Sequence, residues 1–387
     1  MMLWFKDLAC SPVAFVDDTL AFVWVFWSSK RLSPIRSSVR CGFQSLRFGL
    51  EESTFNYSLN HIRCQKRCLI SKMTSCQGSE FHRETHRYGQ KNILQEISVY
   101  YPRSGPQPDP SSSVWIIYIH GGAWRDPAIT SISFEPTLDA LASDCDSQTL
   151  QRVAAFASID YRLSANPNFP QDPTSTEPTD LRCAIHPDHL NDVRNAIAYL
   201  QNKFEFRERY ILVGHSCGAT LAFQTVMGSV LNAESKRSEA TELNIELPIA
   251  IVGVAGIYDL RLLRDTFKDI VIYQEFIKAA FGSDEKLWDG VSPARVEGQT
   301  SIENWWANGR LAVLAHSEAD ELVDVGQLRT MAKVIGKWRA AGTRGLPRNL
   351  LLLDDLKHSH DEIWSKGDEL AQVIAKTVFE LQRLEKS

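Results

Sequence analysis

The stretch Gly214-His215-Ser216-Cys217-Gly218 constrains the fold of this chain more than any other. It follows the apolar, β-prone run 210–213 and precedes the helix-prone run 219–223. In so tight a turn from strand to helix, side chains two positions before and after the serine would collide, so both positions require glycine. The pattern predicts a strained Ser216 whose hydroxyl stands at the start of a helix, as in a nucleophile elbow. A plain glycine-rich turn is the alternative interpretation.

A second motif lies upstream, after the continuous apolar run Val114–Ile119, which is typical of a strand buried on both faces. The next five residues are His120, Gly121, Gly122, Ala123 and Trp124. Glycine in such a loop lets the backbone approach a reacting carbonyl group closely. We therefore expect the backbone N–H groups of Gly122, Ala123 and Cys217 to form an oxyanion hole. We expect His120 to brace the loop, and a simple tight turn is the alternative.

An acidic residue is expected in the loop after a late strand, because a catalytic serine needs a histidine that a carboxylate orients. The run Leu311–His316 is typical of a buried strand, and Asp320 lies in the loop that follows it. We assign the carboxylate to Asp320, with Glu318 and Asp324 as neighbouring alternatives in an acidic loop. The order of serine, acid and histidine along the chain agrees with this choice.

The histidine is expected after the last apolar run, Asn349–Leu353, where the chain carries two candidates, His358 and His360. We favour His360 because it directly precedes residues 361–364, which are typical of the start of the final helix.

These assignments define a chemistry. Ser216 attacks a carbonyl carbon, His360 accepts its proton, and Asp320 fixes the imidazole tautomer and stabilises the imidazolium. This chemistry needs no cofactor and no metal, and the sequence has no His-Glu-x-x-His pattern.

The composition sets broad limits on partners and location. The 387 residues carry a formal net charge of −5, and 44% of them are hydrophobic and 23% charged. Nothing in this balance favours nucleic-acid binding. Five of the eight cysteines precede residue 80 and the others are scattered, which does not indicate a disulfide framework. We therefore expect a reducing, cytoplasmic location.

Residues 1–72 differ in character from the rest of the chain, with short apolar patches and then a stretch rich in Arg, Lys, Ser and Cys. The apolar run Leu20–Trp27 is too short to cross a membrane, and no secretory signal or mitochondrial presequence is clear. We expect no membrane association. We interpret residues 1–72 as an extension that is not part of the native protein, with Met73 as the true start and residues 80–387 as the catalytic domain.

The rest of the chain alternates between strand-like and helix-like segments. Strand-like runs at 94–101, 153–161 and 249–256 add to those above, and residues 188–200 have helical spacing. The alternation predicts an α/β fold with a doubly wound, mostly parallel sheet, helices on both faces and the site at the carboxyl ends of the strands. Of the remaining segments, 261–310 is expected to form a small helical cap and 164–179 a long surface loop.

Taken together, these motifs resemble the α/β-hydrolase superfamily and, within it, the kynurenine formamidases (arylformamidases) of fungi. The resemblance covers about residues 80–387 and rests on residues 120–124, 160–163, 214–220, 256–260 and 360–363. His-Gly-Gly-x-Trp is its sharpest motif, because lipase-like esterases of the group more often carry His-Gly-Gly-Gly. The resemblance also carries Ser216, Asp320 and His360 over as the catalytic triad.

The resemblance implies hydrolysis of N-formyl-L-kynurenine to L-kynurenine and formate, in tryptophan catabolism and de novo NAD synthesis, by a cytosolic and cofactor-free enzyme. A formamidase of this kind must hold an aryl ring and a zwitterion as its small-molecule substrate. Trp124 and Tyr161 are candidates to stack on the ring, and Arg125 is a candidate to pair with the carboxylate.

Two other functions compete with this one. The same triad serves carboxylesterases and lipase-like enzymes, and an inactive hydrolase fold can act as an interaction module. The complete set of catalytic residues disfavours the inactive fold, whereas the triad alone does not separate a formamidase from an esterase. The oligomeric state stays open, with a homodimer as one alternative.

Overall fold

The structure, a computed structural model of the whole chain, describes residues 80–103, 109, 112–143, 149–228, 245–342 and 347–386. All of them belong to the compact unit Gln77–Ser387. The predicted extension, residues 1–72, lies outside the described residues.

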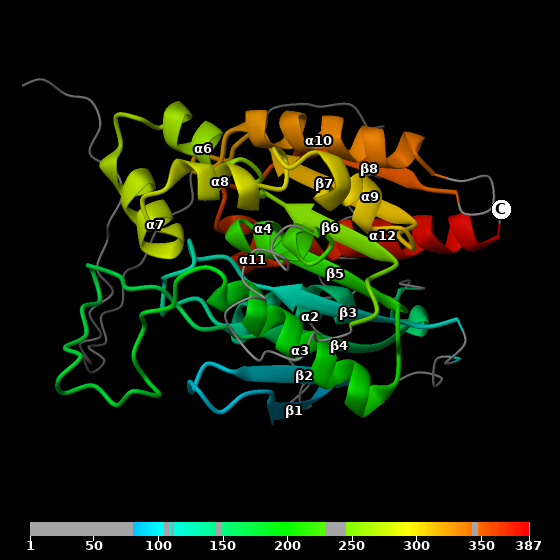
Figure 1. Cartoon of the computed structure of the whole chain (residues 1–387). Helices are drawn as coiled ribbons and strands as arrows, with labels where there is room; N and C mark the ends of the chain where they lie inside the picture. Colours follow the sequence, from blue (N-terminus) through cyan, green and yellow to red (C-terminus); the bar gives the residue numbers. More distant parts are fainter. Residues whose placement is uncertain are drawn as a thin grey trace, which may run out of the picture. The chain divides into compact units, whose positions relative to one another are not determined.

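Eight strands form one mostly parallel sheet in the order β1-β2-β4-β3-β5-β6-β7-β8. Their bounds are β1 (Phe81–Arg87), β2 (Glu96–Pro102), β3 (Val114–Ile119), β4 (Val153–Ile159), β5 (Tyr210–His215), β6 (Ala250–Val254), β7 (Leu311–Ser317) and β8 (Asn349–Leu356). The pairs β1–β2 and β2–β4 are antiparallel, and every neighbouring pair from β4 to β8 is parallel. The loops after β3, β5, β7 and β8 therefore leave the same edge of the sheet, on the left in Figure 1.

Helices cover both faces of this sheet (Figure 1). Their bounds are α2 (Glu135–Ser143), α3 (Asp188–Phe204), α4 (Cys217–Gln224), α6 (Leu260–Thr266), α7 (Val271–Phe281), α8 (Glu285–Val291), α9 (Ile302–Trp305), α10 (Val325–Ala340), α11 (Glu362–Lys366) and α12 (Asp368–Glu385). Helices α3, α4 and α10 share one core with the sheet, and α2, α11 and α12 share the other. β3 is buried throughout because its alternate residues enter the two cores, with Ile117 and Ile119 in the first and Ile116 and Tyr118 in the second.

The predicted fold class is therefore confirmed. The strand predicted at Val114–Ile119 has those bounds in the structure, and the predicted helix 188–200 continues to Phe204. Residues 164–179 contain neither helix nor strand, as expected of a long loop.

The segment expected to form a cap contains α6, α7, α8 and α9, and α7 lies beyond the carboxyl ends of the strands in Figure 1. Two contacts tie α7 to the loops at this end. The Tyr273 hydroxyl donates to the carbonyl oxygen of Leu322 (2.8 Å), and the Phe276 ring lies 6.2 Å from the Trp124 ring. Helix α7 therefore covers the two loops that carry the predicted oxyanion hole and the predicted acid.

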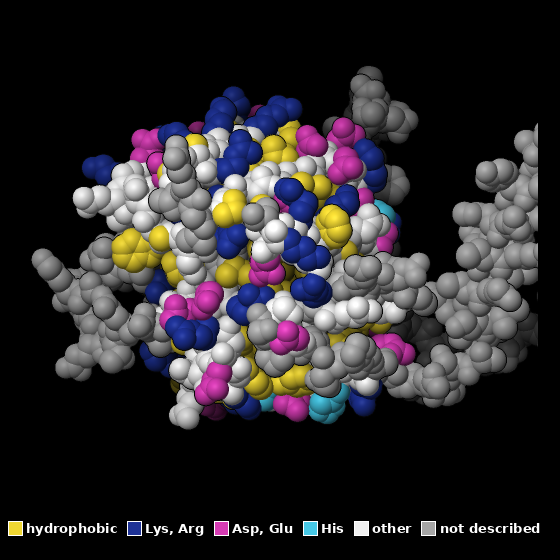
Figure 2. Space-filling model, turned by 90° about the vertical axis from the view of Figure 1, so that its right-hand side faces the viewer, with side chains coloured by type: hydrophobic (Ala, Val, Ile, Leu, Met, Phe, Trp, Pro, Cys, Tyr) yellow, Lys and Arg dark blue, Asp and Glu magenta, His cyan; other side chains and the backbone are white. Residues whose placement is uncertain are grey.

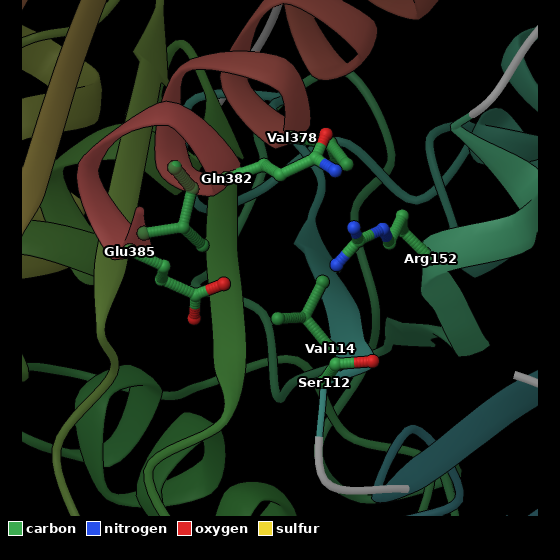
Figure 3. A pocket seen from close by; sticks show the side chains of 7 residues that line it. Ser112, Val114, Arg152, Val378, Gln382 and Glu385 are labelled. Atoms are coloured by element: carbon green, nitrogen blue, oxygen red, sulfur yellow. The ribbon is translucent and has the colours of Figure 1, made fainter. Parts of the chain in front are cut away.

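The opposite end of the sheet holds a shallow hollow where β3 and β4 begin and α12 ends (Figure 3). Arg152, Val114 and Glu385 are among the residues that line it. Figure 2 shows this end of the unit, where Lys and Arg side chains are interspersed with Asp and Glu. The hollow lies at the amino ends of the strands, so it is not part of the predicted site. Among the described residues, no helix has the length and apolar character needed to cross a membrane.

The stacked pair Trp306 and Trp338 gives a test of the packing between α10 and the segment after α9. The ring centroids are 4.5 Å apart, and the Trp338 indole N–H donates to the carbonyl oxygen of Trp306 (3.0 Å). Trp338→Ala should lower the unfolding free energy in urea by about 3–5 kcal/mol, because it leaves a large cavity. The matched change Trp305→Ala, at a side chain that is 38% exposed, should cost less than half as much. Equal losses would contradict this packing.

Candidate active site

Ser216 stands between β5 and α4 in a strained backbone conformation. Its φ of 54° and ψ of −122° lie in a region that residues other than glycine rarely adopt, at a cost of about 1–3 kcal/mol. Three backbone hydrogen bonds hold it there: its N–H donates to Val254 (2.9 Å), and its carbonyl oxygen accepts from Ala219 (3.0 Å) and Ile257 (3.3 Å). A strained residue held this firmly is typical of a functional position.

The two glycines of the motif are required by close backbone contacts. A Cβ on Gly214 would overlap the carbonyl oxygen of Gly218. A Cβ on Gly218 would overlap the carbonyl oxygen of Ile119, at the end of β3. The first turn of α4 can therefore lie directly against the loop that follows β3.

That loop turns through three successive residues with positive φ, Gly122 (96°), Ala123 (49°) and Trp124 (59°). The carbonyl oxygen of Gly122 accepts hydrogen bonds from Arg125 and Asp126, both at 2.9 Å, which close the turn. Among the described residues, no backbone carbonyl accepts from the N–H of Gly122 or Ala123.

The start of α4 supplies a further donor beside this loop. Cys217 is the first residue of the helix, so its N–H has no partner within the helix. The Trp124 N–H is already used, because it donates to Cys217 Sγ (3.3 Å). Burial raises the pKa of the Cys217 thiol to about 11, so this sulfur stays a neutral thiol.

His120 and Tyr161 pack against each other and support the loop that follows β3. The Tyr161 hydroxyl donates to the carbonyl oxygen of His120 (3.1 Å), and the two rings stack with centroids 4.4 Å apart. Burial lowers the pKa of His120, although the nearby Asp160 carboxylate opposes this effect. Tyr161 is fully buried, and its stacking on a substrate ring stays a prediction. Its ring and hydroxyl are already used to hold the loop.

Asp320 and His360 meet at the carboxyl ends of β7 and β8. His360 Nδ1 lies 2.9 Å from Asp320 Oδ2 and 3.0 Å from Asp320 Oδ1. Asp320 Oδ1 also accepts the backbone N–H groups of Leu322 (3.0 Å) and Val323 (2.9 Å). Burial by itself raises the pKa of Asp320, but the hydrogen bonds from His360 and these amides outweigh it and hold the pKa below its ordinary value.

The alternatives for the acid and the histidine have other partners. Asp324 caps α10 by accepting from the Gly326 N–H (2.7 Å), and the Glu318 carboxylate lies on the surface beside Lys357 (3.3 Å). His358 Nε2 lies 3.0 Å from the Asp368 carboxylate. The structure therefore brings Asp320 and His360 together and leaves the alternatives apart from them.

Two residues that the sequence analysis did not single out also contact His360. The Glu321 carboxylate accepts the backbone N–H of His360 (3.1 Å). His215 Nε2 lies 3.1 Å from the carbonyl oxygen of His360, and burial lowers the pKa of His215 well below its ordinary value. The neutral His215 ring therefore carries its proton on Nε2 and donates it to that carbonyl. The position of His215 next to the serine was a usable signal, whereas nothing in the sequence marked Glu321.

The reactive atoms themselves are unpaired. Among the described residues, neither Ser216 Oγ nor His360 Nε2 makes a hydrogen bond, and both side chains are nearly buried. His215 connects Ser216 with His360: it directly precedes Ser216 in the chain, and its ring centroid lies 4.7 Å from that of His360. Within the same part of the chain, no cluster of His, Cys, Asp or Glu is suited to hold a metal ion.

The side chains of Trp124 and Arg125 lie under α7. Trp124 is fully buried and packs edge-on against Phe281, with ring centroids 4.9 Å apart. The Arg125 guanidinium lies 5.8 Å from the centre of the Phe276 ring.

The mostly parallel sheet, the strained serine between strand and helix and the acid–histidine pair after the last strands define an α/β-hydrolase. The fold is similar to that of esterase B from Lactobacillus rhamnosis, with a TM-score of 0.52, 14% identity and coverage of 87% of this chain and 100% of that one. It is also similar to a hormone-sensitive lipase from a metagenome library, with a TM-score of 0.51, 16% identity and coverage of 79% of this chain and 87% of that one.

Sequence comparison narrows the family. The BD-FAE family model matches residues 98–335. A kynurenine formamidase-like hydrolase of Fusarium equiseti is 41% identical over 292 residues, which are 75% of this chain and 91% of the relative. A kynurenine formamidase of Aspergillus versicolor is 37% identical over an alignment of 272 residues that covers 66% of this chain and 84% of the relative. The chain therefore belongs to the BD-FAE family of α/β-hydrolases. Within this family it belongs to the kynurenine formamidases.

The contact of Gly218 with β3 can be tested by adding one methyl group. Gly218→Ala should lower the unfolding free energy by about 1–3 kcal/mol or more, because the clash is with backbone and no side chain can move aside. Gly336→Ala is the matched control, because a Cβ there meets no atom within 4 Å and alanine favours the α10 helix. Urea denaturation of both variants should therefore show shifts of opposite sign, and a stable Gly218→Ala protein would contradict the contact.

Proposed function

We propose that the protein hydrolyses N-formyl-L-kynurenine to L-kynurenine and formate through a formyl-enzyme on Ser216. The names of its relatives supply the substrate. The observation that carries the chemistry is the buried His360–Asp320 hydrogen bond (2.9 Å), close to a serine in a strained strand-to-helix turn.

The histidine tautomer determines the first step. Asp320 is ionised above its lowered pKa, so it accepts a proton from His360 Nδ1 and leaves Nε2 as the free base. Ser216 Oγ attacks the formyl carbon while its proton passes to His360 Nε2. The carbonyl oxygen becomes an oxyanion, for which we propose the N–H groups of Gly122, Ala123 and Cys217 as donors. Each such donor is worth about 3 kcal/mol in the transition state.

The second step releases the amine. The intermediate collapses, the bond between the formyl carbon and the aryl nitrogen breaks, and the nitrogen takes the proton from His360 as L-kynurenine leaves. Water then attacks the formyl ester, giving its proton to His360 Nε2. When the second intermediate collapses, Ser216 Oγ regains that proton, and formate leaves together with one proton to solvent. Besides the carbonyl oxygen and the nitrogen, the formyl carbon carries only a hydrogen atom, so the acyl side needs little room.

Removing the nucleophile or the base should abolish turnover. Ser216→Ala and His360→Ala should each lower kcat on N-formyl-L-kynurenine by a factor of about 10⁴ or more, because both groups act in the same step. His358→Ala is the matched control, since its ring pairs with Asp368 and should leave kcat within a few-fold of wild type. Wild-type turnover of p-nitrophenyl acetate without turnover of the formamide would instead assign the protein to the carboxylesterases.

Asp320→Asn should separate the two roles of Asp320, which are to orient the His360 ring and to supply a negative charge. The amide keeps the shape but favours the wrong tautomer, so kcat should fall by a factor of about 10⁴. Because the folded pKa of Asp320 is lowered, its charge stabilises the fold at neutral pH, and this contribution is lost as the pH falls below 3.8. The difference in unfolding free energy between wild type and variant should therefore shrink as urea melts move from pH 7 to pH 3. A constant difference would contradict the proposed state of Asp320.

We further propose a cytoplasmic location, which the free thiols of Cys183 and Cys217 support. We also propose that residues 1–72 are an extension that is not part of the native protein. Mass spectrometry of the native N-terminus tests the extension, and peptides from residues 1–72 would overturn it. Gel filtration with light scattering distinguishes a monomer from the homodimer.

A further inference from the structure

Arg125 is an unusual residue in this structure. Only 6% of its surface is exposed, yet among the described residues its guanidinium makes no hydrogen bond and no ion pair. Its Nη1 is a buried donor without a partner. A buried guanidinium normally pairs with a carboxylate, because leaving it unpaired costs several kcal/mol of solvation.

The nearby carboxylates do not meet this need. Burial lowers the pKa of Arg125, and the negative charges of Glu275 and Asp126 only partly oppose this effect. An arginine nevertheless stays charged in a protein, so a positive charge lies under α7 with no carboxylate in direct contact among the described residues. A charge retained at this cost indicates a ligand that supplies the missing anion.

The backbone of Arg125 is fixed close to the reacting centre. Its N–H donates to the carbonyl oxygen of Gly122 (2.9 Å), and its own carbonyl oxygen accepts from Asn166 Nδ2 (3.2 Å). Arg125 therefore follows the proposed oxyanion loop directly and cannot move independently of it. The guanidinium lies over Phe276 of α7, with 5.8 Å from Cζ to the ring centroid.

A second unpaired donor lies next to Arg125. The Nε1 atom of Trp124 is buried and has no partner among the described residues. Its indole packs against Phe276 and Phe281 of α7, with ring centroids 6.2 and 4.9 Å away. Adjacent residues thus carry two buried, unpaired N–H groups, a chemistry that suits an anionic group of a ligand.

We propose that Arg125 binds the carboxylate of the substrate's amino-acid arm and so makes the enzyme selective for anionic aryl formamides. The inference rests on the proposed formamidase function. The guanidinium presents parallel N–H groups that match a carboxylate in a bidentate pair. This pair would form under α7, away from bulk water, where it contributes more than at the surface.

The test compares two substrates that differ only in the anion. The full chain, Arg125→Met and Arg125→Lys are assayed on N-formyl-L-kynurenine and on its α-carboxamide. Arg125→Met should lower kcat/KM on the acid about 10- to 100-fold, mainly through KM, because a charge-assisted hydrogen bond is lost. On the neutral carboxamide the loss should be several-fold smaller. Arg125→Lys should be more active on the acid than Arg125→Met, since lysine keeps the positive charge but cannot form a bidentate pair.

A control and a binding measurement complete the design. Arg339→Met, at an exposed position on α10, removes one positive charge elsewhere and should leave both substrates unaffected. Equal losses on acid and carboxamide in Arg125→Met would make Arg125 structural and overturn the proposal, as would no loss on either.

Calorimetric titration of L-kynurenine and its α-carboxamide measures the same selectivity without turnover. If the wild type does not hydrolyse the formamide but binds L-kynurenine in an Arg125-dependent way, the proposed function fails and the anion site stands. If L-kynurenine does not bind, the anion site fails as well.

Discussion

The close contact between the first turn of α4 and the end of β3 is the constraint on which this active site depends. Gly218 has no Cβ, so the helix begins directly against the carbonyl oxygen of Ile119. The contact places Ser216 and the N–H of Cys217 beside the loop that follows β3. The nucleophile and its proposed oxyanion donors therefore come from two segments far apart in the sequence, and their distance is set by backbone packing rather than by flexible side chains.

The other half of the site is held just as firmly. His360 is fixed at three points: Nδ1 by Asp320, its backbone N–H by Glu321 and its carbonyl oxygen by His215. Because His215 directly precedes Ser216, it links the histidine loop to the serine turn. Helix α7 is tied to the same acid loop through Tyr273, whose hydroxyl donates to Leu322. Movement of this cap would therefore be coupled to the loop that orients the base.

The sequence predicted the elements with strong local signals. β3 is a continuous apolar run bounded by polar residues and glycines, so its ends agreed with the structure. The chain order placed the acid in the loop after β7 but did not separate Asp320 from Asp324, which caps α10 in the structure. The role of Tyr161 could not be read from sequence, because a buried aromatic that supports a loop and one that faces a ligand look alike there. Glu321 was missed because its partner is a backbone N–H far along the chain, and such a contact leaves no pattern.

Covalent labelling of the full chain with a fluorophosphonate, followed by peptide mass spectrometry, tests whether Ser216 is the nucleophile. We expect a single adduct, on Ser216, whose formation slows in the presence of N-formyl-L-kynurenine because substrate and reagent compete for the same nucleophile. Labelling of another serine, or labelling of Ser216 that the formamide does not slow at any concentration, would contradict this expectation.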